Sequence, residues 1–226
     1  MIRVHVVCEG QTEEMFVNEL LAPSVRHKDI VLVPALLGEP GHKGGNVKIE
    51  RVVKDVRLRL LGERSAYCTL LIDFYGISPK FPGYEEASRM NQHTTKSEIL
   101  IREMSAAIET AVGPDAMRRF IPYVQMYEFE GLLFSEPSTF ASAISCPELA
   151  SDFAAIRSSF RSPEEINDSQ TTAPSKRIEA LYPEFEKPIH GTFGAMEIGI
   201  QRIRDECPLF SGWLAAIENL SAGETT

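Results

Sequence analysis

The first 130 residues alternate between two patterns of hydrophobic and polar positions. Four short and mostly apolar runs occupy 2–8, 30–37, 66–73 and 120–127. Nearly continuous apolar runs of this length are typical of strands that are buried on both faces of a parallel sheet. Between the runs, apolar residues recur every three or four positions, which predicts amphipathic helices.

Three helices are predicted between these strands, over 12–21, 47–61 and 94–112. The third has the clearest signal, because an apolar stripe runs along it and Gly113-Pro114 ends it. Strands that alternate with helices predict an α/β fold, in which a mostly parallel sheet of four or more strands is flanked by helices.

After about Ser135 the pattern changes to short amphipathic segments separated by polar loops. We therefore expect an α/β core over 1–135 and a helical C-terminal region over 136–226 that packs on the core as one structural unit.

Three of the four predicted strands end in carboxylates. Glu9 follows the first strand, Asp73 ends the third, and Glu128 and Glu130 follow the fourth. The carboxyl ends of parallel strands lie at one edge of a sheet, so these acids should converge there. Mg²⁺ prefers oxygen ligands, and two such ions can stabilise a phosphodiester displacement. The alternative is that the chain simply leaves the core for solvent at these points.

Two further acids follow Glu9 closely in the stretch "VVCEGQTEE". Glu13 and Glu14 fall in the first turn of a predicted helix, where the helix dipole favours anions. Helix-start chemistry explains both, and we expect no catalytic role for either.

The charge balance limits the classes of function. The chain has 226 residues, with 32 acidic against 23 basic side chains and a net charge of −9. This excess argues against coating nucleic acid by electrostatics alone. A nuclease stays compatible with it, because carboxylates at a metal site are themselves negative and a partner subunit can supply basic surface. Since no apolar window reaches about 18 residues and no signal peptide is present, we expect a cytoplasmic protein without membrane contact.

Five basic side chains are candidates for binding phosphate. Lys43 stands in the glycine-rich loop "GEPGHKGGN", which lacks the spacing of a P-loop. Lys176 and Arg177 stand in a predicted first helical turn, where their charge opposes the helix dipole. Lys187 and His190 flank Pro188, and a histidine can carry a proton near neutral pH. The alternative is that each is an exposed or structural loop residue.

Several motifs resemble known families. "VVCEGQTEEMFV" resembles the glutamate motif that opens Toprim domains, the catalytic module of topoisomerases, primases and OLD-type nucleases. Together with "LLIDFYGISPKFPG", "MYEFEGLLF", "APSKRI" and "KPIHGTFG…CPLFSGWL", it resembles an uncharacterised family of bacterial proteins, a domain of unknown function regarded as a distant Toprim relative. The resemblance covers nearly the whole chain.

The resemblance to Toprim domains implies roles for particular residues. Glu9 takes the place of the Toprim glutamate, a metal ligand or general acid/base, and Asp73 that of the first aspartate of an Asp-x-Asp motif. Tyr75 stands where the second aspartate belongs, so Glu128 or Glu130 would have to supply that carboxylate.

These observations predict a Toprim-like, Mg²⁺- or Mn²⁺-dependent nuclease that acts on DNA or RNA. Glu9 and Asp73 would carry the reaction together with Lys43 and Lys187, and the resemblance implies an ATPase partner in bacterial defence. Two alternatives stay open: a non-catalytic scaffold or regulatory subunit that binds a protein partner, and a nucleotide phosphohydrolase or phosphotransferase.

Overall fold

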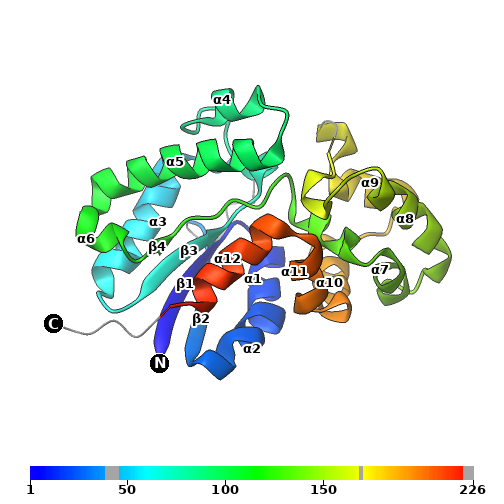
Figure 1. Ribbon diagram of the computed structural model, residues 1–226, viewed down its shortest axis with the longest axis horizontal. Helices are drawn as coiled ribbons and strands as arrows, with labels where there is room; N and C mark the ends of the chain where they lie inside the picture. Colours follow the sequence, from blue (N-terminus) through cyan, green and yellow to red (C-terminus); the bar gives the residue numbers. More distant parts are fainter. Residues whose placement is uncertain (39–45, 168–169, 221–226) are drawn as a thin grey trace.

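The computed structural model describes residues 1–38, 46–167 and 170–220, and its centre is a sheet of four parallel strands (Figure 1). The strands lie in the order β2-β1-β3-β4, and they span Ile30–Leu36, Ile2–Cys8, Tyr67–Leu71 and Phe120–Ile121 respectively. The predicted α/β class and the parallel sheet are confirmed.

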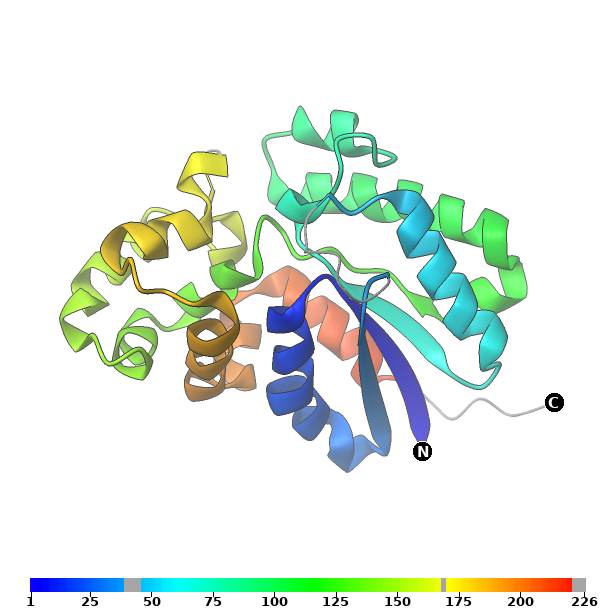
Figure 2. The ribbon, with the colours of Figure 1, turned by 180° about the vertical axis from the view of Figure 1, so that it is seen from behind.

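Helices cover both faces of this sheet (Figure 2). On one face lie α1 (Gln11–Phe16), its π-helical continuation Val17–Leu21, α2 (Ala22–Val25) and α12 (Pro208–Glu218). The other face is covered by α3 (Ile49–Gly62) and α5 (His93–Val112). Side chains of β1 alternate between the two cores, since Val4 and Val6 join the first and Val7 joins the second.

The predicted strand over 120–127 is wrong in length, because the ladder of β4 stops after Ile121. Pro122 has no N–H with which to extend it. After Pro122 the chain stays close to the end of β3 and pairs with it once more at Gln125. There Gln125 N donates to Ile72 O at 2.9 Å, and Phe74 N donates to Gln125 O at 2.9 Å.

The region after Ser135 is helical, as predicted. It contains α7 (Pro137–Ala143), α8 (Ala150–Ser158), α9 (Pro174–Leu181), α10 (Thr192–Ile198) and α11 (Ile200–Glu206). Helices α7 to α10 lie beside the sheet in Figure 1, while α12 returns to its face. The short helices α4 (Tyr84–Ser88) and α6 (Pro114–Met117) flank α5. No helix in the described part of the chain is long and apolar enough to cross a membrane.

One buried side-chain bond joins α12 to the sheet. Trp213 Nε1 donates to Thr69 Oγ1 at 2.8 Å, and Thr69 Oγ1 donates to Ile121 O at 2.7 Å. The indole also stacks on Tyr123, with 4.6 Å between ring centroids. Helix α12 is therefore tied to both β3 and β4.

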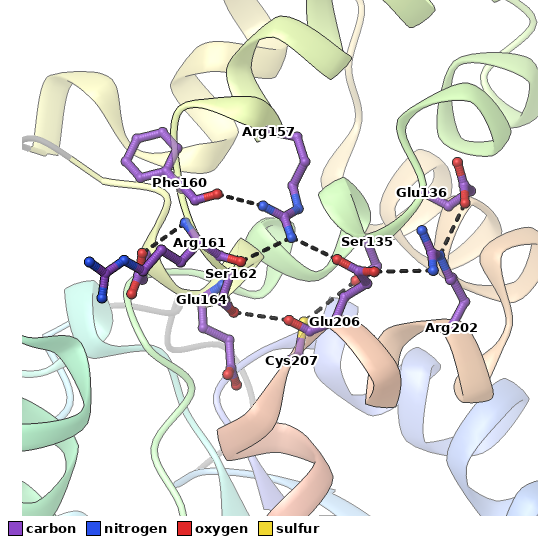
Figure 3. Close-up of polar contacts among 11 residues, drawn as sticks. Ser135, Glu136, Arg157, Phe160, Arg161, Ser162, Glu164, Arg202, Glu206 and Cys207 are labelled. Atoms are coloured by element: carbon purple, nitrogen blue, oxygen red, sulfur yellow. Dashed lines mark hydrogen bonds and ion pairs between the residues drawn. The ribbon is translucent and has the colours of Figure 1, made fainter.

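A second polar network lies next to the start of α12, where Arg157, Ser162 and Arg202 contact Glu206 at the end of α11 (Figure 3). The buried carboxylate of Glu164 accepts hydrogen bonds from Leu209 N at 2.9 Å and Phe210 N at 2.8 Å. Nearby, Arg157 pairs with Glu206 at 2.6 Å. Burial raises the pKa of Glu164 to about 7, although the two N–H donors oppose this shift.

Glu164 makes stability depend on pH. Its carboxyl holds a proton more tightly in the folded state (pKa about 7) than in the unfolded chain (4.5), so folded stability should fall as pH rises between these values. In Glu164→Gln, the decrease in the free energy of unfolding over this pH range should be smaller by up to about 3 kcal/mol. The free energy of unfolding, measured in urea from pH 4.5 to 8, checks this. The exposed Glu148→Gln serves as control, and a Glu164→Gln protein with the wild-type pH slope would contradict the prediction.

Candidate acidic site at the sheet switch point

The direction of strand addition reverses between β1 and β3. The chain places β2 on one side of β1 and then crosses back to place β3 on the other side. In open α/β sheets, such a topological switch point is where ligands bind, beyond the carboxyl ends of the strands. Glu9 and Asp73 leave the sheet here, and Glu9 N donates to Leu71 O at 3.0 Å.

The Glu9 carboxylate is directed across the switch point toward the segment after β3. Its Oε2 accepts a hydrogen bond from Asp73 N at 3.1 Å. It also lies directly against Gly76, where an added Cβ would come within 2.1 Å of Glu9 Oε2. The absence of a side chain at residue 76 therefore leaves room for this carboxylate.

Gly76→Ala should displace the Glu9 carboxylate, because 2.1 Å is far inside any van der Waals contact. We expect the variant to lose about 1–3 kcal/mol of stability and, if the site binds Mg²⁺, to bind it at least tenfold more weakly. Calorimetric titration with Mg²⁺ and urea unfolding measure the two effects. Gly62→Ala is the control, since a Cβ there meets nothing within 4 Å. Equal ion affinity in both variants would contradict the expected displacement.

Asp73 has a buried oxygen with no hydrogen bond. Its Oδ1 is inaccessible to solvent and has no hydrogen-bond partner in the part of the chain that the structure describes. Burial, with the neighbouring carboxylates of Glu13, Glu9 and Glu130, raises the pKa of Asp73 well above its usual value, and Lys187 opposes the shift. A proton on this carboxyl, or a cation beside it, would relieve the repulsion.

Glu13 belongs to the same cluster, which the sequence interpretation missed. Its Oε2 accepts from Gly10 N at 2.9 Å, as a first-turn acid can, yet only 6% of the residue is exposed. Burial raises its pKa to about 7, with Glu9 and Glu130 adding to the effect. No helical spacing relates Glu13 to Glu9, because Glu9 follows strand β1 and Glu13 lies in the first turn of α1, so the sequence pattern held no direct signal for this contact.

Glu128 and Glu130 reach the site from the segment after Gln125 and share one lysine. Lys187 Nζ lies 3.2 Å from Glu130 Oε2 and 3.6 Å from Glu128 Oε1. Glu128 Oε2 also accepts from Ser175 N at 2.9 Å. Burial raises the pKa of Glu130, and Lys187 opposes it. The pKa of Lys187 is raised, because Glu130, Glu128 and Asp73 outweigh its burial, so the ammonium stays charged.

We call this group the acidic site. Its members are Glu9, Glu13, Asp73, Glu128, Glu130 and Lys187. All four predicted metal ligands are among them. Carboxylate oxygens suit a hard divalent cation, and the unbonded Asp73 Oδ1 is a free donor atom for one. Within residues 1–38, 46–167 and 170–220, however, no three His, Cys, Asp or Glu side chains already stand as ligands around one point. Ion binding would thus require small rotations of these side chains.

Of the other predicted phosphate-binding residues, Lys43 lies outside the described residues. The two that lie on α9, Lys176 and Arg177, each have a partner nearby in the chain. Lys176 is exposed and pairs with Glu179. Arg177 Nε donates to Thr172 O at 2.8 Å. Their predicted phosphate contacts stay predictions.

His190 is also engaged within its own segment. Its Nδ1 accepts from Glu186 N at 2.9 Å, and its ring packs against Tyr182 and Phe185. Lys187 is therefore the predicted phosphate ligand that the described structure places among the carboxylates.

Tyr75, for which the resemblance to Toprim domains implied a lost second aspartate, makes a local bond of its own. Its hydroxyl donates to Asn167 Oδ1, and burial raises its pKa, so it stays protonated. The carboxylates whose charges act on Asp73 include Glu13 from α1 and Glu130 from the segment after β4.

The fold and the site together define an α/β protein with a four-stranded parallel sheet and an acidic cluster at its switch point. The chain belongs to the family described as "Domain of unknown function (DUF4276)", which matches residues 8–218 and so includes the whole acidic site. This confirms the resemblance to an uncharacterised family. No curated protein and no solved structure matches the chain.

Proposed function

We propose that the acidic site binds Mg²⁺ or Mn²⁺ and that the protein hydrolyses phosphodiester bonds of DNA or RNA in the manner of a Toprim-like nuclease. One observation carries the proposal. The buried carboxyl of Asp73, whose Oδ1 has no hydrogen bond among the described residues, lies near the carboxylates of Glu9, Glu13 and Glu130, and Lys187 links Glu130 to Glu128.

Such a cluster is unfavourable for stability. Buried carboxylates repel one another and lose hydration, which is why the pKa values of Glu13, Asp73 and Glu130 are all raised. Neutral side chains would pack at lower cost. Groups of titratable residues with strongly perturbed pKa values are typical of functional sites.

Each side chain has a task in this proposal. Asp73 and Glu9, with Glu130 and Glu128, would hold the ion, which supplies positive charge to a phosphate group when bound. Glu13, with a pKa of about 7, can accept or donate a proton near neutral pH. Before substrate binds, Lys187 pairs with the carboxylate of Glu130. Afterwards its ammonium group can form an ion pair with a phosphate oxygen instead.

Tyr75 favours a second candidate function, a non-catalytic scaffold, because the second aspartate is absent and Lys187 already neutralises two acids. As a scaffold, the protein would bind a partner protein. The resemblance of its motifs to known families suggests an ATPase subunit as that partner. A nucleotide phosphohydrolase could use the same acidic edge.

Ion titration and substrate assays separate these candidates. Calorimetric titration with Mg²⁺ and Mn²⁺ at pH 6, 7 and 8 should give affinity that rises with pH, because an ion must displace the protons held by Asp73 and Glu13. Repeating the titration in buffers of different ionisation enthalpy counts the protons released. Plasmid, single-stranded DNA, RNA and nucleoside triphosphates are then incubated with the protein and each ion.

Each result has one interpretation. Cleavage of plasmid, DNA or RNA supports the nuclease. Ion binding with cleavage of nucleoside triphosphates alone supports the phosphohydrolase. Ion binding without any cleavage supports the scaffold, and a protein that binds neither ion at any pH overturns the metal site itself.

A further inference from the structure

A polar cleft with a volume of about 820 Å³ lies between the start of α5 and the segment that follows α8. Its lining includes His93 and Lys96 of α5, Tyr127, and Phe160, Arg161 and Asn167 from the C-terminal region. A cleft of this size is within the range of small-molecule sites and is larger than a single inorganic ion needs.

Lys96 is a half-buried cation in this cleft. Its Nζ lies 5.3 Å from the ring centroid of Tyr127 and 5.6 Å from that of Phe74. Among the described residues, no carboxylate forms an ion pair with it, and burial lowers its pKa. The aromatic faces stabilise the ammonium in part, but they leave its charge uncompensated and able to attract an anion.

The one acid among the residues that line the cleft is Glu165, and it bonds to two other lining residues. Glu165 Oε2 accepts from Arg161 N at 3.0 Å, and Glu165 Oε1 lies 3.5 Å from His93 Nδ1. Within the described chain neither the Lys96 ammonium nor the exposed Arg161 guanidinium forms an ion pair, so the lining has two basic side chains against this one acid. In a protein with a net charge of −9, this local excess of positive charge requires an explanation.

The cleft and the acidic site share their dividing wall. Tyr127 lines the cleft and directly precedes Glu128, while Phe74 and Tyr75 directly follow Asp73. Tyr75 N donates to Tyr127 O at 3.1 Å, and the Tyr75 hydroxyl donates to Asn167 in the cleft lining. A ligand with two linked anionic groups could therefore place one at each side of this wall.

We propose that this cleft binds a phosphate group of the nucleic-acid strand whose neighbouring phosphate lies at the acidic site, with Lys96 and Arg161 as its cationic ligands. Arginine and lysine are the usual partners of phosphate oxygens. That the ligand is a nucleic-acid strand rests on the proposed function. That the cleft binds phosphate rests on the charges of Lys96 and Arg161. It also explains how an acidic protein can hold a polyanion.

Binding of a labelled strand without divalent ions tests this role separately from catalysis. The anisotropy of a fluorescein-labelled, ten-residue single-stranded DNA is measured in EDTA at several salt concentrations. Lys96→Met and Arg161→Gln should each weaken binding roughly three- to tenfold and make the slope of log K against log salt shallower by about 0.7. Lys80→Met and Arg64→Gln carry the same charge changes at exposed positions and should bind like wild type.

Direct calorimetric titration with inorganic phosphate and with a nucleoside monophosphate identifies the source of the phosphate. If both bind wild type, bind Lys96→Met and Arg161→Gln more weakly, and the strand fails to bind, the cleft is a phosphate site but the nucleic-acid source is overturned. If Lys96→Met and Arg161→Gln bind the strand as their controls do, or if no phosphate compound binds, the inference as a whole is overturned. A strand that binds through these residues but is never cleaved with any ion would contradict the nuclease and leave the cleft assignment intact.

Discussion

Asp73→Asn is expected to abolish divalent-ion binding at the acidic site and to lower any ion-dependent cleavage by a hundredfold or more, while the protein stays as stable as wild type or becomes more stable at pH 7. The loss follows from removing the carboxylate on which the neighbouring acids converge. The stability follows because asparagine has the shape of the protonated acid and cannot take a negative charge beside the carboxylates of Glu9, Glu13 and Glu130. Calorimetry, cleavage assays and urea unfolding on the same preparation measure all three.

Asp115→Asn is the matched control, because that aspartate has a side chain that is 90% exposed and pairs with the exposed Arg118. It should leave ion binding unchanged. An Asp73→Asn protein that binds Mg²⁺ with wild-type affinity would remove the metal site. One that has lost binding only because it has unfolded would contradict the stability half of the prediction.

Lys187→Met should destabilise the protein by about 1–3 kcal/mol at pH 7. Breaking a buried ion pair typically costs about 3–5 kcal/mol, because the remaining charge has no partner. The cost is smaller here, since the Lys187 side chain is 40% exposed although that of Glu130 is only 2% exposed. The free energy of unfolding at pH 7 measures this change.

The second member of the pair tests the origin of that cost. Combining Lys187→Met with Glu130→Gln should recover most of the lost stability, because the double variant buries no unpaired charge at that point. Lys176→Met, which removes an exposed lysine on α9, should cost under about 0.5 kcal/mol. A double variant no more stable than Lys187→Met alone would show that packing of the lysine, and not its charge, is what matters.

The sequence was sufficient to predict the convergence of Glu9 and Asp73, because strand ends in a parallel sheet meet at one edge. Glu13 escaped notice for a physical reason. A carboxylate in a first helical turn has an adequate local explanation, and the burial that gives it a pKa of about 7 depends on segments more than a hundred residues away in the chain. The preference of a helix start for acids already explains a glutamate at position 13. Its place in the acidic site was therefore hidden in the sequence.

For the basic residues, residue type alone predicted more phosphate ligands than the structure brings to the acidic site. Lys187, Arg177 and His190 were all candidates by residue type, but only packing decides which of them meets an acid. Arg177 bonds to a nearby carbonyl and His190 to a nearby N–H, while Lys187 reaches Glu130. Lys96 was not a candidate at all, because a lysine on an amphipathic helix has solvent as its ordinary surroundings. The side of the cleft that faces it includes Phe160, Arg161, Glu165 and Asn167, and the position of this segment could not be predicted from a helical pattern.

The bond between Trp213 and Thr69 has a consequence for the order of folding during synthesis. Its two residues are separated by 144 positions, so β1 and β3 leave the ribosome long before the helix that covers one of their faces. Until α12 is made, the part of that face over β3 and β4 is exposed and apolar, a state in which a nascent chain is prone to aggregate. Contacts of such large sequence separation also form slowly. A chain that is released before Trp213 is synthesised should therefore be recognised by chaperones and proteases instead of persisting as a shortened but working protein.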